Sequence, residues 1–163
     1  LERPLTNAKH NDKVVSMIPT FRPDGTLPPG VHWSSWREFT ARFGTTGHRR
    51  RLLAGLRRAI RSLREAGCAV VYIDGSFVME KPAPNDFDAC WSVKGVEPDK
   101  LDSVLLDFSD DRAAQKAKFG GELFPAELPE GASGRRFLEF FQLDKATGQA
   151  KGIVGIRLRR SEA

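Results

Sequence analysis

Two aspartates lie one residue apart in an apolar stretch near the middle of the chain. Asp86 and Asp88 flank Phe87 in the segment DFDACW. Side chains two residues apart in a strand point to the same face, so the carboxylates lie side by side while Phe87 points into a core. Neighbouring carboxylates repel each other, and a hard cation such as Mg²⁺ (or Mn²⁺) relieves this repulsion while keeping coordination positions for a substrate phosphate. The spacing therefore predicts a divalent metal site that acts on phosphate groups.

A glycine and a serine follow the preceding apolar run, and Asp74 before them is interpreted as a turn residue. Gly75 lets the backbone approach a ligand closely. Exposed N–H groups there and the Ser76 hydroxyl can hold phosphate oxygens. The ten residues from Ser76 to Asp86 allow a loop to turn and a neighbouring strand to begin. We therefore expect Gly75 and Ser76 to bind phosphate beside the metal ligands, with Lys81 in the loop adding positive charge.

The combined pattern resembles a known superfamily. Gly75-Ser76, a gap of about ten residues and Asp86-Phe87-Asp88 in an apolar run resemble the signature of the DNA-polymerase-β-like nucleotidyltransferases. IPTFRPDGTLPPGVH, YIDGSFVMEKPAPNDFDACW and KFGGELFPAE also resemble segments of a largely uncharacterised group of small bacterial nucleotidyltransferase-like proteins. The resemblance covers about residues 17 to 160. It implies transfer of a nucleoside monophosphate from a nucleoside triphosphate such as ATP to a hydroxyl of RNA, protein or a small molecule.

The resemblance also implies a third carboxylate on a later strand. Glu122 in GGELFP fits best, because it lies early in a short apolar run that follows an expected helix. It would complete the metal site and orient or deprotonate the attacking hydroxyl. Asp107 and Glu139 are the alternatives, the first expected within or at the end of a helix and the second on a hairpin.

A second class of function stays open because the chain is short. Catalytic members of the superfamily often carry an added helical domain that holds the base and the acceptor. The alternative is a catalytically inactive binding module of the same fold, such as the regulatory or antitoxin half of a toxin–antitoxin pair, working with a second small protein. A Ser/His/Asp hydrolase is not expected, because His10, His32 and His48 do not cluster with the acids.

The segment HRRRLLAGLRRAIRSLREAG, residues 48–67, is the clearest predicted helix. An apolar stripe recurs at intervals of three and four residues, and Gly67 follows the last turn. The stripe consists of Leu52, Leu53, Leu56, Ile60 and Leu63. The arginines of the segment are Arg49, Arg50, Arg51, Arg57, Arg58, Arg61 and Arg64. They form either a solvated outer face or a surface for a polyanion, and the net charge of +5 is consistent with nucleotide or nucleic-acid partners.

The remaining pattern predicts an α/β (α+β) fold with a single mixed sheet and helices packed on it. A proline-rich arm leads into a short helix that carries Trp36, Phe39 and Phe43. The other expected elements are strands at 68–73 and 86–93, a helix at 98–118, a strand-like apolar pair after two glycines in 120–128, and a hairpin around a Thr-Gly turn in 137–160.

The length of 163 residues suits one domain. Met17 is interpreted as the natural start, with residues 1–16 disordered or an upstream extension. Residues 17–163 then form one nucleotidyltransferase-like domain, with the arm and short helix at 17–47 and the core at 48–163. No apolar run is long enough to span a membrane. Cys68 and Cys90 are interpreted as buried core residues, which predicts a reducing, cytoplasmic location.

Overall fold

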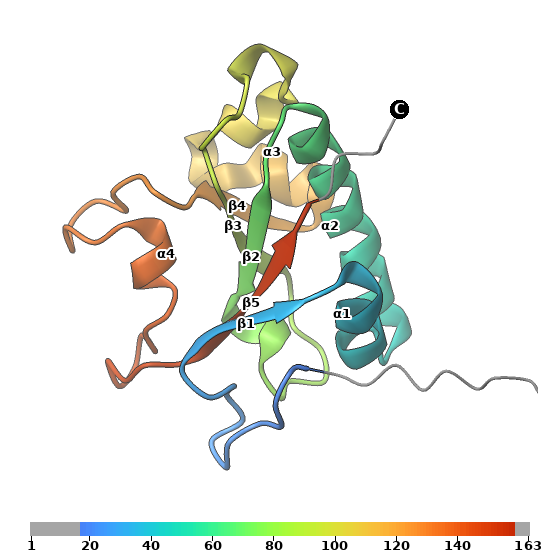
Figure 1. Cartoon of the computed structure of the whole chain (residues 1–163), viewed down its shortest axis with the longest axis vertical. Helices are drawn as coiled ribbons and strands as arrows, with labels where there is room; N and C mark the ends of the chain where they lie inside the picture. Colours follow the sequence, from blue (N-terminus) through green and yellow to red (C-terminus); the bar gives the residue numbers. More distant parts are fainter. Residues whose placement is uncertain (1–16, 159–163) are drawn as a thin grey trace, which may run out of the picture.

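The computed structural model describes residues 17–158, so the extension expected at residues 1–16 lies outside the described part. One five-stranded sheet with the order β1-β5-β2-β3-β4 forms the centre of the domain (Figure 1). The strands are β1 (Gly30–Ser34), β2 (Val70–Asp74), β3 (Phe87–Trp91), β4 (Gly121–Pro125) and β5 (Gly152–Arg157). The pairs β1–β5 and β3–β4 are parallel, whereas β2 is antiparallel to both of its neighbours. The predicted single mixed sheet is confirmed.

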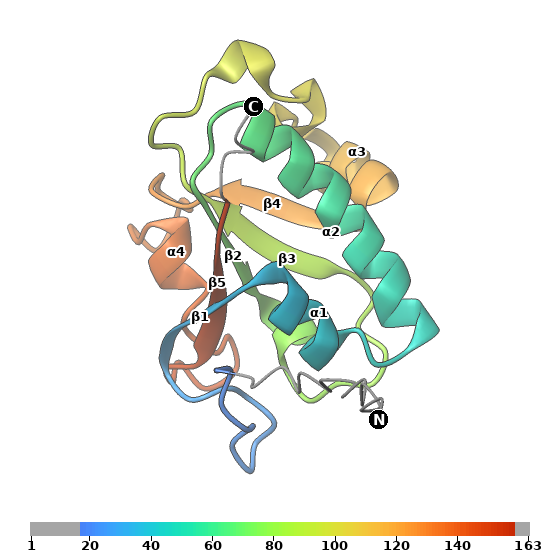
Figure 2. The same ribbon diagram turned by 45° about the vertical axis from the view of Figure 1, so that its right-hand side comes forward.

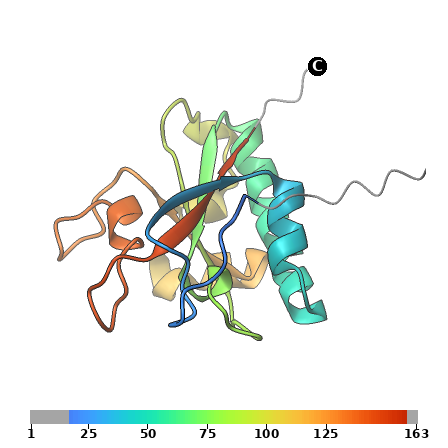
Figure 3. The ribbon, with the colours of Figure 1, turned by 60° about the horizontal axis from the view of Figure 1, so that its bottom comes forward.

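Helices cover both faces of this sheet. The α-helices are α1 (Trp36–Phe43), α2 (Gly47–Glu65), α3 (Ser109–Phe119) and the short α4 (Phe137–Phe140). The views in Figures 2 and 3 place α1 and α2 on one side of the sheet and α4 on the opposite side. None of the helices within residues 17–158 is long and apolar enough to cross a membrane.

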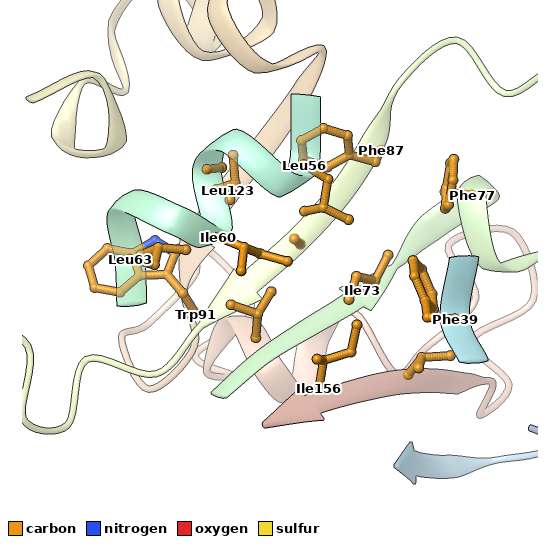
Figure 4. Packing of buried hydrophobic residues seen from close by; sticks show 14 of the residues in the cluster. Phe39, Leu56, Ile60, Leu63, Ile73, Phe77, Phe87, Trp91, Leu123 and Ile156 are labelled. Carbon is orange, nitrogen blue, oxygen red and sulfur yellow. The ribbon is translucent and has the colours of Figure 1, made fainter. Parts of the chain in front are cut away.

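Helix α2 confirms the predicted apolar stripe. Its N-cap is Thr46, whose side chain accepts a hydrogen bond from Arg49 N. The stripe residues are buried, and Figure 4 shows Leu56, Ile60 and Leu63 lying over the sheet. The sheet side chains below them are Ile73, Phe87, Trp91, Leu123 and Ile156 (Figure 4). Each fully buried side chain of this size contributes about 1.5–3 kcal/mol to folding, so this face forms the main core.

A close approach between the backbones of α2 and α3 helps to position the edge strand β4. Gly55 of α2 lies against the carbonyl of Phe119, because a Cβ at Gly55 would meet Phe119 O at 1.7 Å. Gly120, with φ of 83°, then turns the chain from α3 into β4. The buried side chain of Gln115 accepts a hydrogen bond from Leu123 N at 2.9 Å. These contacts position β4, and with it Glu122.

The structure corrects the expected arm at 17–47 and the expected helix at 98–118. The arm contains strand β1, which pairs with β5 more than a hundred residues later. The segment 98–118 divides into two 3₁₀ turns, η2 (Pro98–Lys100) and η3 (Ser103–Leu106), followed by α3. The break has a local cause, since the Asp102 side chain accepts from Val104 N and Asp107 accepts from Ser109 N. Such side-chain bonds compete with helix continuation.

The expected hairpin at 137–160 is also only partly right. Its second strand is β5, but its first strand is replaced by α4 and a single antiparallel bridge between Leu143 and Ala150. The apolar residues of α4 pack on Phe124 instead of pairing with β5. The Thr-Gly turn does form, with Gly148 at a φ of 69°.

Candidate functional site

Three neighbouring strands each place an acid at the same level of the sheet. Asp74 on β2 pairs in register with Asp88 on β3, and Asp88 pairs in register with Glu122 on β4. Directly opposed strand residues point to the same face. The residues next to them in sequence, Ile73, Phe87 and Leu123, are buried in the main core. The three acids therefore share the face opposite α2.

Asp86 joins this row from the loop side. It lies two residues before Asp88, immediately ahead of β3, and is partly buried. Burial alternates along this segment as predicted: Phe87 is fully buried, whereas Asp86 and Asp88 are partly exposed. The DFD spacing thus presents two carboxylates on one side and an apolar residue on the other.

Gly75 brings the backbone directly against this row. It follows the last residue of β2 and adopts a φ of 67°. A Cβ at this position would lie 2.3 Å from Oδ2 of Asp88. Ser76 follows in the 3₁₀ turn η1 (Gly75–Val78), which the buried side chains of Phe77 and Val78 anchor. The Gly-Ser pair and the paired acids are therefore neighbours in space.

Burial and neighbouring negative charges raise the pKa of three of these acids, Asp74, Asp86 and Asp88. Burial, and then the charges of Asp86 and Glu122, raise the pKa of Asp88 to about 6. Burial and the charge of Glu122 raise the pKa of Asp86. The pKa of Asp74 lies well above its usual range because that carboxyl is fully buried and faces Asp88. Burial combined with neighbouring like charges raises carboxyl pKa values in this way, and such shifts are frequent at functional sites.

Four lysines offset the repulsion in part. Lys116 and Lys81 oppose the rise in the pKa of Asp86. Lys151 and Lys145 act in the same sense on Asp74 and Asp88. Lys81 acts on the charge of Asp86 from the loop before β3. The other three were missed because their segments reach the site only through tertiary folding.

Glu122 has two cationic partners. Its carboxylate accepts from Arg112 Nε at 2.8 Å and forms an ion pair with Lys116 Nζ at 3.1 Å. Arg112 adopts a φ of 58°, in a left-handed turn at the start of α3. The two alternatives for the third carboxylate lie elsewhere. Asp107 accepts hydrogen bonds from Ser109, and Glu139 is exposed on α4.

Asp74 is the site residue that sequence reasoning misinterpreted. It is the last residue of β2 rather than a turn residue, and it is fully buried. Its Oδ1 has no hydrogen-bond partner, while Oδ2 accepts from the Cys90 thiol at 3.7 Å. An orphaned buried oxygen costs free energy. The signal in the sequence was its position immediately before Gly-Ser, at the end of an apolar strand.

The donor set fits one particular kind of metal binding. Within residues 17–158, no three His, Cys, Asp or Glu side chains gather closely enough to hold an ion by themselves. Mg²⁺ is commonly held by one or two carboxylates together with substrate phosphates and water. Asp86 and Asp88 supply that number of carboxylates, and the lysines around them suit phosphates. The residues present therefore fit an ion that binds together with a phosphorylated substrate.

An apolar wall borders the acids on the same face. Phe124 on β4 stacks on Phe137 with ring centroids 4.8 Å apart and contacts Phe141 at 5.2 Å. Tyr72 and Leu138 pack against the same cluster. The face thus combines the row of acids with a neighbouring aromatic cluster, whose centre, Phe124, is buried.

Comparison with known proteins places the chain in a family. A family model described as "Family of unknown function (DUF6932)" matches residues 19–157. No curated protein and no solved structure matches the chain. The matched region includes every residue predicted for the site, from Gly75 to Glu122, and extends over the whole sheet. The protein therefore belongs to the family of unknown function DUF6932.

Proposed function

We propose that this protein is a Mg²⁺-dependent nucleotidyltransferase that moves a nucleoside monophosphate from a nucleoside triphosphate to a hydroxyl acceptor. The observation that carries the proposal is the register of Asp88 with Glu122, with Asp86 beside them and the backbone of Gly75 against Asp88. The resemblance to the polymerase-β-like superfamily leads to the same chemistry, and the family match leaves the activity open.

The acids have separate roles in this proposal. Asp86, just before β3, and Asp88 on β3 would hold the ion through their carboxylate oxygens. When bound, Mg²⁺ supplies Lewis-acid stabilisation of the charge that develops on the phosphoryl oxygens. Glu122 orients or deprotonates the acceptor hydroxyl, whose oxygen bonds to the α-phosphorus while the bond to pyrophosphate breaks.

The basic groups around the acids support binding of a triphosphate. Lys81 and Lys116 act on Asp86, whereas Lys145 and Lys151 act on Asp88. Lys116 is paired with Glu122 and Asp111. Within residues 17–158, Lys81, Lys145 and Lys151 form no ion pair, so a cation that neutralises Asp86 and Asp88 leaves these three to pair with phosphate oxygens. The backbone at Gly75 and the Ser76 hydroxyl offer further donors at the same edge of the sheet.

A labelling experiment tests the activity. The purified protein is incubated with each of the four α-labelled nucleoside triphosphates and Mg²⁺, with RNA, protein and small-molecule acceptors. We expect Mg²⁺-dependent incorporation of label from at least one nucleotide. The variant Asp86→Asn with Asp88→Asn should abolish it, whereas Glu139→Gln, a change of an exposed side chain on α4, should not.

The same experiment separates the alternative function. An inactive binding module of this fold would bind nucleotide or a partner protein, would incorporate no label, and would be insensitive to the double substitution in its cellular effect. If the protein neither incorporates label nor binds nucleotide with Mg²⁺, both the enzyme and the binding-module proposals are rejected.

A further inference from the structure

A cleft at the β1 edge of the sheet carries a ligand signature of its own. It has a volume of about 950 Å³ and lies between α1, the C-terminal half of α2 and the ends of β1 and β5. Its lining contains five arginines, which are Arg37, Arg57, Arg61, Arg64 and Arg157. The acids of the proposed active site do not contribute to it.

The charged groups that line this cleft are mostly positive. Glu38 is the one acid in the lining, and it is buried and bonded to Met17 N and Ser34 Oγ. Within residues 17–158, none of the five arginines forms an ion pair with a carboxylate. Arg57, Arg61 and Arg64 recur at four and three residues along α2, so they project from one side of the helix. A concave site lined by unpaired guanidinium groups favours a polyanion.

Tryptophans supply a second, independent feature. Trp33 and Trp36 both line the cleft. Trp33 is 37% exposed despite its size. The guanidinium of Arg157 lies 3.9 Å from the centre of the Trp33 ring. The ring of Tyr72 on β2, two strands away in the sheet, has its centre 5.9 Å from that of Trp33. Planar aromatic and guanidinium groups of this kind are platforms on which bases stack.

We infer that this cleft, the Arg–Trp cleft, binds single-stranded nucleic acid. The arginines contact the phosphate backbone, and Trp33 with Arg157 offers a surface for a base. A bilayer is disfavoured because the site is a cleft, and a purely acidic peptide would leave the aromatic platform unused. The inference concerns binding alone and stands whether or not the protein transfers nucleotides.

A binding titration tests the charge component. The probe is a fluorescent oligouridylate of about 16 nucleotides, long enough for one such site, with a duplex of the same length for comparison. Replacing Arg57, Arg61 and Arg64 by Gln should weaken binding and reduce the slope of log K against log salt by about 2, since each phosphate contact contributes about 0.7. The matched control replaces Arg50, Arg51 and Arg58 by Gln. These residues lie on the same helix but outside the cleft, so the control should keep the slope of the unchanged protein.

The base-stacking component has a separate readout. Oligouridylate should quench tryptophan fluorescence, and Trp33→Phe should remove most of that quenching while the protein keeps its melting temperature. Trp33→Ala should weaken binding by about tenfold or more. The inference would be overturned if the two triple arginine variants lost the same affinity for oligouridylate, or if the duplex bound more tightly than the single strand. It would also be overturned if anionic vesicles bound as tightly as oligouridylate and Trp33 substitutions had no effect.

Discussion

Gly75 and Asp88 are in direct contact, because a Cβ on Gly75 would lie 2.3 Å from Oδ2 of Asp88. Gly75 also has a φ of 67°, a conformation that side chains disfavour. The glycine therefore serves two purposes. It turns the chain at the end of β2, and it leaves room for the carboxylate that we assign to metal binding.

Gly75→Ala should lower both stability and nucleotide binding. The positive φ alone costs about 1 kcal/mol. Displacement of the Asp88 carboxylate should add to this cost and should remove Mg²⁺-dependent binding of nucleotide. The measurements are thermal unfolding and calorimetric titration with nucleotide.

Gly148→Ala is the matched control for that variant. Gly148 has a φ of 69°, but a Cβ there would meet nothing within 4 Å. It should show the conformational cost and keep nucleotide binding. If both variants lost the same amount of stability and bound nucleotide equally well, the close approach of Gly75 to Asp88 would not matter for nucleotide binding.

Asp88→Asn should stabilise the metal-free protein at neutral pH. The pKa of Asp88 is raised from 3.8 to about 6 on folding, so the folded state holds the proton more tightly. Stability due to this group is therefore full below about pH 4 and is lost as the pH rises to about 6. Asn removes the penalty, which we expect to be worth about 1–2 kcal/mol after allowance for solvent screening.

Thermal unfolding in EDTA at pH 7.5 and at pH 4 measures this effect. The gain should appear at pH 7.5 and shrink at pH 4. Asp107→Asn is the control, because hydrogen bonds from Ser109 lower the pKa of Asp107 and no such gain is expected there. A loss of stability in Asp88→Asn at pH 7.5 would contradict the raised pKa.

Glu122→Gln should reduce incorporation of label by about a hundredfold or more, a loss typical of removing a charge that acts on the transition state. It also breaks the ion pairs with Arg112 and Lys116. Glu139→Gln and Asp107→Asn should retain activity, because neither residue belongs to the row of acids. Single-turnover rates for the three variants decide which acid is third, and an unchanged rate in Glu122→Gln would remove it from the site.

Gly55→Ala should destabilise the fold by about 3 kcal/mol or more. In an ordinary helix interior the same change stabilises by about 1 kcal/mol. Here a Cβ would meet Phe119 O at 1.7 Å, so α2 and α3 would have to separate. Gly47→Ala, where the nearest atoms are the flexible ends of Arg51 and Arg50 at 3.6 and 3.9 Å, should be nearly neutral in thermal unfolding.

The parts of the fold that could be predicted are those where the spacing of apolar residues along a short segment determines the structure. The stripe of α2 and the alternation around Asp86 and Asp88 depend only on intervals of 3.6 and 2 residues. Strand β1 was missed because its pairing partner, β5, lies far along the chain. The helix expected at 98–118 failed because Asp102 and Asp107 bond to nearby backbone N–H groups, so the helical spacing of Leu101, Leu105 and Phe108 was not decisive.

The candidate site was predictable in part for the same reason. Glu122 could be nominated from its context, but its register opposite Asp88 arises from the pairing of β3 with β4. Lys145 and Lys151 reach the acids through the loop before β5, and Arg112 reaches Glu122 through a left-handed turn. Such placements depend on tertiary contacts that no local pattern encodes.

The most direct test of the account is a calorimetric titration of the protein with a non-hydrolysable nucleoside triphosphate in Mg²⁺ and in EDTA. We predict binding in Mg²⁺, marked weakening in EDTA, and loss of the Mg²⁺-dependent part in Asp86→Asn with Asp88→Asn while the variant stays folded. Binding that is equally strong in EDTA, or that survives the double substitution, would contradict the assignment of these two carboxylates as the metal site.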